Sequence, residues 1–216
     1  AEIWTPERTF NSYLTALTEY ESAISQIHKR VESALASFGL KPHKIESRCK
    51  DPLSLFVKQG TKNYVTPWTD CSDLLGVRVI VQLSSDKARV LQAVEQTDDL
   101  GILEVDDKEL DRDYKELAYA GLHLDVHCNG MTTSLSDSLR CEVQVRTVAE
   151  HTWAEIEHEY IYKGPGLIPK ETQRQFARVL ALVELMDIEL DRGVRTVSEL
   201  DSFSILRLTR FLSQSA

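Results

Sequence analysis

Residues 140–146, Arg-Cys-Glu-Val-Gln-Val-Arg, alternate strictly between polar and apolar side chains. This period of two predicts a β-strand that buries one face and presents charged groups on the other. Residues 121–127, Gly-Leu-His-Leu-Asp-Val-His, repeat the pattern. Two such strands require a sheet with one covered apolar face, and the polar face is either ordinary solvated surface or the wall of a site.

Helical and extended segments surround these two strands. Apolar residues at steps of three and four predict helices over residues 6–38, 86–96, 148–162 and 172–190, with a weaker helical tail over 198–211. An extended stretch is expected at residues 43–50, and further strands at 74–83 and 102–105. This order predicts an α+β protein with a central mixed sheet of about five strands, flanked by a long N-terminal helix and by C-terminal helices.

Composition limits the kinds of partner. The 216 residues suffice for one domain, and 42% hydrophobic with 27% charged residues is typical of a folded soluble protein. A net charge of -9 argues against an extended grip on nucleic acid or on an anionic membrane, so that a site for a polyanion must be local. No apolar run is long enough to span a membrane and the start has no secretory pattern, so we expect a cytoplasmic protein.

The four cysteines predict reduced thiols. Cys49, Cys71, Cys128 and Cys141 show no CxxC spacing and have apolar or strand-like neighbours. His151, Glu155 and His158 share one helical stripe, but without the HExxH spacing they are interpreted as surface or supporting residues. We therefore expect no zinc site.

A basic cluster surrounds a predicted helix start. Asp51 is the expected N-cap and Pro52 the first helical residue. Near them are a hydroxyl and three cations, namely Arg48, Lys50, Ser54 and Lys58. Free N–H groups and the helix dipole favour an anion at such a position, so the cluster predicts a polyphosphate site, with a solvated basic face as the alternative.

Asp73 stands at the edge of the predicted strand 74–83, with Arg78 further along that strand. Mg²⁺ in phosphoryl-transfer sites is usually held by one or two carboxylates and by the substrate's phosphates. A second carboxylate is therefore expected from elsewhere in the fold, and Glu142 on the alternating strand is the candidate. An ordinary loop acid is the alternative for Asp73.

Together these pieces resemble the synthetase domain of the RelA/SpoT family. The resemblance rests on Arg48-x-Lys50-x-x-x-Ser54-x-x-x-Lys58, Asp73-x-x-Gly76-x-Arg78, Tyr119-x-x-Leu122-His123, Glu142-Val-Gln144-Val-Arg146-Thr147, and a helix with Trp153, His158, Tyr162 and Lys163. It covers residues 45–163 and looks like the stand-alone small alarmone synthetases. It implies a nucleotidyltransferase-like fold and one synthetase domain over 1–216, with an N-terminal helix at 1–44, a catalytic core at 45–163 and C-terminal helices at 164–216.

The resemblance also implies an activity, namely ATP-dependent transfer of pyrophosphate to the ribose 3′-hydroxyl of GDP or GTP, which makes (p)ppGpp and AMP. Arg48, Lys50, Ser54, Lys58 and Arg78 would bind ATP, with Lys87 or Arg89 as further contacts. Asp73 and Glu142 would bind Mg²⁺, and Glu142 would also take the proton of the 3′-hydroxyl. The acceptor nucleotide would be held by Tyr119, which stacks on its base, and by His123, Gln144 and Arg146.

The acceptor stays open at this stage. Residues 113–118, Asp-Tyr-Lys-Glu-Leu-Ala, lack the Lys-Pro and Asn-Gly elements that are usual in the family before the stacking tyrosine. Alternatives are a toxin-type relative that makes (p)ppApp or pyrophosphorylates the tRNA 3′ end, and a catalytically inactive nucleotide- or RNA-binding module. Retention of both Asp73 and Glu142 argues against the inactive module. A homo-oligomer and a complex with an antitoxin also remain open, and no membrane partner is expected.

Overall fold

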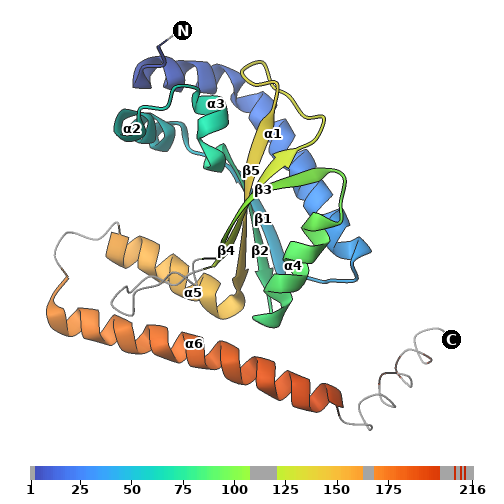
Figure 1. Cartoon of the computed structure of the whole chain (residues 1–216). Helices are drawn as coiled ribbons and strands as arrows, with labels where there is room; N and C mark the ends of the chain where they lie inside the picture. The colour runs from blue at the N-terminus through green and yellow to red at the C-terminus, as the bar shows by residue number, and fades with distance from the viewer. Residues whose placement is uncertain are drawn as a thin grey trace.

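The computed structural model describes residues 3–107, 121–162 and 168–199, and also residues 207, 210 and 212. The predicted α+β fold is confirmed, because a five-stranded mixed sheet lies at the centre with helices around it (Figure 1). The elements are α1 (Pro6–Ser37), β1 (Lys44–Cys49), α2 (Pro52–Lys62), α3 (Pro67–Asp70), β2 (Leu75–Val81), α4 (Ser85–Glu95), β3 (Leu100–Asp107), β4 (Leu122–Cys128), β5 (Leu139–Thr147), α5 (Val148–Ile156) and α6 (Lys170–Glu199). A 3₁₀ turn, Ser72–Leu74, precedes β2, and a π-helical stretch, Glu157–Tyr162, follows α5.

The strand order in the sheet is β1-β2-β5-β4-β3. The central strands β2 and β5 run parallel, and every other neighbouring pair is antiparallel. Because β2 and β5 are parallel, the start of β2 lies beside the start of β5. Residues that are far apart in sequence, such as Gly76 and Glu142, are therefore register partners.

The apolar face of the sheet is the core predicted from the alternation. Val77, Val79, Val143 and Val145 are at most 1% exposed. Helices α1 and α4 cover this face, since α1 contacts β1 and β2 while α4 contacts β3 and β5. The strict alternation of β5 is thus explained by one face that packs on helices and one that does not.

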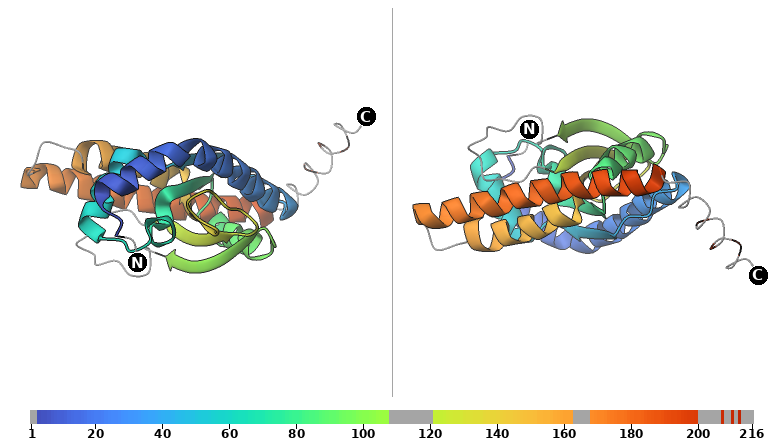
Figure 2. Two further views of the ribbon diagram at one scale, coloured as in Figure 1. Left: turned by 90° about the horizontal axis from the view of Figure 1, so that it is seen from above. Right: turned by 90° about the horizontal axis from the view of Figure 1, so that it is seen from below.

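Helix α1 has a capping residue at its start and a glycine directly after its C-cap. The Thr5 hydroxyl accepts a hydrogen bond from the backbone N–H of Arg8 at 3.3 Å, and Pro6 occupies the first turn. Phe38 caps the other end, and Gly39 follows with a φ of 72°, a left-handed conformation that favours glycine. α1 and α6 lie on opposite sides of the molecule (Figure 2).

Helix α6 is longer than the predicted range 172–190 and is anchored at three levels. Phe176 packs edge-on against Trp153 of α5, with ring centroids 5.9 Å apart, and Leu180 is buried. Asp187 accepts a hydrogen bond of 2.7 Å from the Thr147 hydroxyl, and Asp191 accepts three from Ser84 and Ser85. These acids hold α6 against the ends of β5 and α4.

The structure bears on two further predictions, while a third lies almost entirely outside the residues that it describes. Cys49, Cys71, Cys128 and Cys141 are free thiols. Within the described ranges no helix combines the length and the apolar character that crossing a bilayer requires. The helical tail predicted for residues 198–211 falls almost entirely outside the described residues.

Candidate active site

The polar face of the sheet carries the predicted site residues in adjacent rows. Register pairing places Arg48 beside Gly76, Gly76 beside Glu142, and Glu142 beside Asp125. The next row contains Glu46, Arg78, Gln144 and His123. Paired residues point to the same face, so that four strands contribute to one polar surface.

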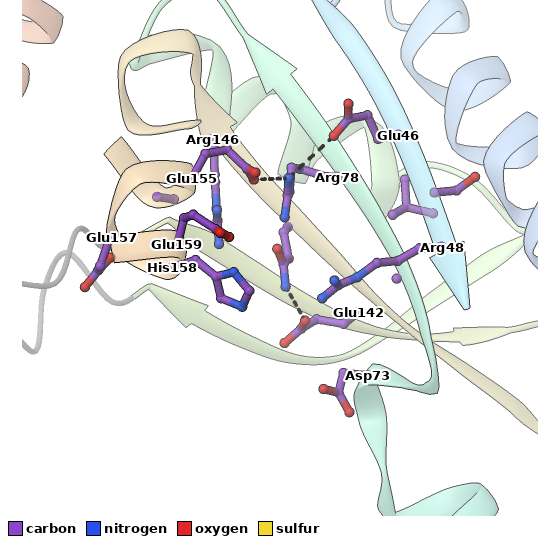
Figure 3. Close-up of a pocket in the computed structure, with 15 residues that line it drawn as sticks. Glu46, Arg48, Asp73, Arg78, Glu142, Arg146, Glu155, Glu157, His158 and Glu159 are labelled. Atoms are coloured by element: carbon purple, nitrogen blue, oxygen red, sulfur yellow. Dashed lines mark hydrogen bonds and ion pairs between the residues drawn. The ribbon is translucent and has the colours of Figure 1, made fainter. Parts of the chain in front are cut away.

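A cavity of about 1070 Å³ lies over this surface. Six of the predicted site residues line it, namely Arg48, Asp73, Arg78, Glu142, Gln144 and Arg146. Another wall is formed by Ala154 and Glu155 at the end of α5 and by residues 157–159 in the π-helical stretch. Figure 3 shows the guanidinium groups of Arg48, Arg78 and Arg146 pointing into the cavity, with Asp73 at its edge below Glu142.

Asp73 is held by two lysines. Its Oδ2 accepts a hydrogen bond of 2.6 Å from Lys50 Nζ, and its Oδ1 accepts one of 2.9 Å from Lys58 Nζ. The thiol of Cys71 also donates to Oδ1, at 3.0 Å. Burial alone would raise the pKa of Asp73, but the hydrogen bonds from Lys50, Lys58 and Cys71 outweigh it and hold the pKa well below its ordinary value. Asp73 is therefore ionised at neutral pH.

The backbone explains how Asp73 reaches the lysines. Its φ of -96° and ψ of 21° interrupt the 3₁₀ turn immediately before β2. This region of backbone conformation is sparsely populated and recurs at active sites. The turn places the carboxylate of Asp73 beside α2, which supplies Lys58.

Glu142 has two hydrogen-bond partners on neighbouring positions of the polar face. Its Oε1 lies 3.3 Å from His123 Nδ1, and its Oε2 accepts a hydrogen bond of 2.5 Å from Gln144 Nε2. Burial acts to raise the pKa of Glu142, yet the contacts with His123 and Gln144 leave it lower than usual. The negative charge of Asp73 acts in the opposite direction, which means that the two carboxylates are close enough to influence each other.

The arginines of the cavity differ in their charged neighbours. Arg78 Nη1 lies 2.9 Å from Glu155 Oε1 and 3.5 Å from Glu46 Oε2, so two carboxylates compete for it. Burial and the nearby charge of Arg78 lower the pKa of Arg146. The backbone of Val145 and the side chain of Arg146 explain why residue 121 is a glycine. A Cβ at this position would stand 3.0 Å from the Val145 carbonyl oxygen and 3.1 Å from Arg146 Cγ.

The remaining predicted residues lie around the cavity or outside the described ranges. Ser54 is at the start of α2, where its N–H and hydroxyl both donate to Asp51, which confirms Asp51 as the N-cap. Tyr119 belongs to residues 108–120, which the structure does not describe. Lys87 is buried on α4 against Glu150, and Arg89 pairs with Asp86, so that neither is part of the cavity lining.

The sequence analysis missed two parts of the site. Glu46 lies on β1, on the polar face beside Arg78, and parity along residues 43–50 would have found it. The π-helical stretch directs Glu157 and Glu159 toward the cavity lining, and a local change of helical pitch has no signal in the apolar spacing. His158, interpreted from the sequence as a surface or supporting residue, lies in the same stretch and also lines the cavity. His151 is not part of that lining, and its Nδ1 is 4.0 Å from Glu155.

The donor set fits a hard divalent cation shared with a substrate. In the described ranges, no group of three or more His, Cys, Asp or Glu side chains is arranged to hold a metal ion. Two carboxylates on one cavity, Asp73 and Glu142, surrounded by cations, match the way in which Mg²⁺ is held together with phosphate oxygens. The site can thus accept a polyphosphate and its metal ion.

A family model described as "Region found in RelA / SpoT proteins" matches residues 47–166. The chain belongs to this family. It is similar to GTP pyrophosphokinase YwaC of Bacillus subtilis (strain 168), with 30% identity over 115 residues that are 53% of this chain and 54% of that protein. GTP pyrophosphokinase YjbM of the same strain is 30% identical over 118 residues, 55% of each chain. The match therefore spans about half the length of these curated relatives.

Solved structures of a small alarmone synthetase share the fold. The small alarmone synthetase 1 from Bacillus subtilis superimposes with a TM-score of 0.77 at 22% identity, covering 88% of this chain and 100% of that one. The same synthetase has been solved bound to its product pppGpp and bound to AMPCPP. At this identity the likeness supports the fold.

Proposed function

We propose that this protein is an ATP-dependent pyrophosphokinase that transfers the diphosphate of ATP to the ribose 3′-hydroxyl of GDP or GTP, producing (p)ppGpp and AMP. The observation that carries the proposal is the convergence of Asp73, Glu142 and three arginines on one cavity in a chain of the RelA/SpoT family. The names of the relatives, GTP pyrophosphokinases, support the same reaction.

On the donor side, the cations would bind the phosphates of ATP. Arg48 and Arg78 face the cavity from neighbouring strands, while Lys50 and Lys58 reach its edge at Asp73. Phosphoryl transfer depends on positioning and on neutralising charge, and fixed cations supply both. Ser54 would contribute at the N-terminus of α2, where N–H groups and the helix dipole favour a phosphate.

Asp73, in the turn before β2, and Glu142, within β5, would hold Mg²⁺ from the same side of the sheet. When bound, Mg²⁺ neutralises charge on the phosphate oxygens and orients them. Lys50 and Lys58 must then turn from Asp73 toward the phosphates, because both oxygens of this carboxylate are engaged by donors in the free protein.

Glu142 would serve as the general base. In the transfer, the acceptor's 3′-oxygen forms a bond to the β-phosphorus of ATP, the bond from that phosphorus to the α,β-bridging oxygen breaks, and AMP leaves with the oxygen. The proton of the 3′-hydroxyl passes to a carboxylate oxygen of Glu142. Its lowered pKa keeps Glu142 ionised before transfer, and His123 and Gln144 hold it in place.

On the acceptor side, Gln144 and Arg146 follow Glu142 along β5, and His123 lies opposite Gln144 on β4. We propose that they hold the acceptor nucleotide and that Tyr119 stacks on its base. Polar groups that contact the base edge would decide between guanine and adenine.

A product assay tests the proposal. The protein is incubated with Mg²⁺ and ATP labelled in the β,γ-phosphates, in separate reactions with GDP, GTP, ADP and deacylated tRNA, and the labelled product is resolved. Label on GDP or GTP supports the proposal. Label only on ADP or tRNA would replace it with the toxin-type activity, and label on none would favour a binding module.

Two variants test the carboxylates directly. Asp73→Asn and Glu142→Gln each should lower the transfer rate by at least about 100-fold, since each removes a charge that acts in the transition state. Asp86→Asn is a matched control, because Asp86 pairs with Arg89 on α4 outside the cavity lining. Full activity of either site variant, with circular dichroism unchanged, would exclude the assigned roles.

We further propose that α6 mediates self-association. Leu182, Leu185 and Met186 keep 64%, 51% and 49% of their surface exposed. Exposed apolar groups of this size on one helix favour a protein partner. Light scattering is expected to give a multiple of the 24.5 kDa monomer mass, and Leu182→Glu should shift it to the monomer. A monomer before substitution would leave the antitoxin-type partner as the alternative.

A further inference from the structure

A side chain of α1 reaches the donor side of the active site from outside the residues that the family model matches. Tyr13 is completely buried, and its hydroxyl donates a hydrogen bond of 3.1 Å to the backbone carbonyl of Lys50. The family model begins at residue 47, well beyond α1. The N-terminal helix is thus in direct contact with the segment that carries a donor-side lysine.

Lys50 occupies a junction where the backbone has few other constraints. It follows the last residue of β1 and precedes Asp51, the N-cap of α2, so its carbonyl lies outside both elements. Its N–H donates to the Leu74 carbonyl at 2.9 Å, next to Asp73. The Tyr13 hydroxyl holds the carbonyl group of the same residue. The two contacts fix the path along which the Lys50 side chain leaves the backbone.

The surroundings of Tyr13 keep its hydroxyl in place. The ring stacks on Trp68 at 6.4 Å with an interplanar angle of 20°, and it packs edge-on against Tyr20 at 5.1 Å. A rigid ring in a buried aromatic cluster offers its hydroxyl in one position. A buried hydroxyl without a partner would be costly, so the contact with Lys50 is also favourable for folding.

We propose that Tyr13 is a positioning residue for donor binding, which acts by holding the Lys50 peptide so that Lys50 Nζ reaches Asp73 and the phosphates of ATP. This inference rests on the proposed function, because it assigns Lys50 to the ATP side of the site. Without the hydroxyl, the peptide between Lys50 and Asp51 can rotate. Rotation displaces the lysine stem at the edge of the cavity while the hydrophobic core stays filled.

Tyr20 is a matched control in the same helix. It is as completely buried as Tyr13 and its ring touches the Tyr13 ring. Its hydroxyl interacts with the side chain of Thr133, in the loop between β4 and β5, and makes no hydrogen bond to Lys50 or Asp73. Tyr13→Phe and Tyr20→Phe therefore remove the same atom from the same aromatic cluster, but only the first removes a contact with the donor side.

The experiment compares nucleotide binding by four variants with that of the unsubstituted chain. These are Tyr13→Phe, Tyr20→Phe, Lys50→Met and the double variant Tyr13→Phe/Lys50→Met, and calorimetry gives Kd for AMPCPP with Mg²⁺ and separately for GDP. Tyr13→Phe should weaken AMPCPP binding about 3- to 10-fold, the range of one hydrogen bond, and leave GDP binding within about 2-fold. Tyr20→Phe should change neither constant. In the Lys50→Met background, Tyr13→Phe should have no further effect, because the tyrosine acts through Lys50.

Several results would overturn the inference. AMPCPP binding by Tyr13→Phe equal to that of Tyr20→Phe would reduce Tyr13 to a core residue, whatever the two variants do to stability in urea. A loss that persists in the Lys50→Met background, or that affects GDP equally, would show that Tyr13 does not act through Lys50. If the unsubstituted chain binds no AMPCPP, the proposed function fails first and this inference falls with it.

Discussion

Replacing Lys58 by glutamine should strengthen the binding of a divalent cation to the free protein. Without nucleotide, Lys58 and Lys50 each occupy one carboxylate oxygen of Asp73. An incoming metal ion must therefore displace a lysine and approach two positive charges. Glutamine keeps most of the side-chain length, removes one charge and leaves Asp73 more available.

The size of the effect follows from the pair's geometry. The ion pair measures 2.9 Å, and the two side chains keep 30% and 24% of their surface exposed. Two unit charges about 4 Å apart interact by about 4 kcal/mol at an effective dielectric constant of about 20. Solvent screening and the remaining amide donor reduce the net gain to about 1–2 kcal/mol, which corresponds to a Kd for the metal ion about 5- to 30-fold tighter.

Electron paramagnetic resonance of Mn²⁺ measures this Kd, because the signal of the free ion falls as the ion binds. Lys62→Gln is the matched control, since it removes the same charge one turn further along α2 from an exposed position. The reasoning is refuted if folded Lys58→Gln binds Mn²⁺ no more tightly than the Lys62→Gln and unsubstituted chains. Binding of MgATP should become weaker, because the phosphates lose their contact with the positive charge of Lys58.

Three more substitutions test the supports of the site. Thr147→Val should lower the free energy of unfolding by about 2–3 kcal/mol in urea titrations, because the hydroxyl caps α5 at 3.0 Å from the Glu150 N–H and also donates to Asp187. Burial opposes ionisation of Asp191, but hydrogen bonds from Ser84 and Ser85 lower its pKa. The carboxylate therefore stabilises the fold above the unfolded-state pKa of about 3.9, and this contribution is lost as the pH falls through the lower folded-state pKa. Asp191→Asn should therefore make the free energy of unfolding depend less on pH between about pH 2 and 5. Glu155→Gln should lower the KM for ATP by at most about 5-fold with kcat unchanged in initial-rate assays, because Glu155 is an exposed competitor for Arg78.

Much of the fold was predictable because its signals are local. The alternation at residues 140–146 identified β5, its buried face and its chemical face, and Asp51-Pro52 marked where α2 begins. The strand order could not be predicted from local signals, since pairing between β2 and β5 depends on contacts between distant segments. The length of α6 was underestimated, because the predicted helix ended at residue 190 although Val194 and Val197 continue its apolar spacing past Gly193.

The sequence predicted which residues make up the site better than it predicted which of them contact one another. Arg48, Asp73, Arg78, Glu142, Gln144 and Arg146 do share one cavity. The pairing of Asp73 with Lys50 and Lys58 could not be predicted, because it requires α2 to lie beside the turn before β2. The Tyr13 contact was missed for the same reason, as a tyrosine in an amphipathic helix is indistinguishable from a core residue in sequence.

The parallel pairing of β2 with β5 has a consequence for how the protein becomes active as it folds. Strands that run parallel cannot be closed by a short turn, so this pair forms only after a long stretch of chain has been brought back. Asp73 precedes β2 and Glu142 lies in β5, and they meet only when that step is complete. The local helices and the antiparallel β3 and β4 can form earlier without creating a site. Under the proposed function, recovery of pyrophosphate transfer during refolding should therefore follow the slowest structural phase, and a partly folded chain should transfer none.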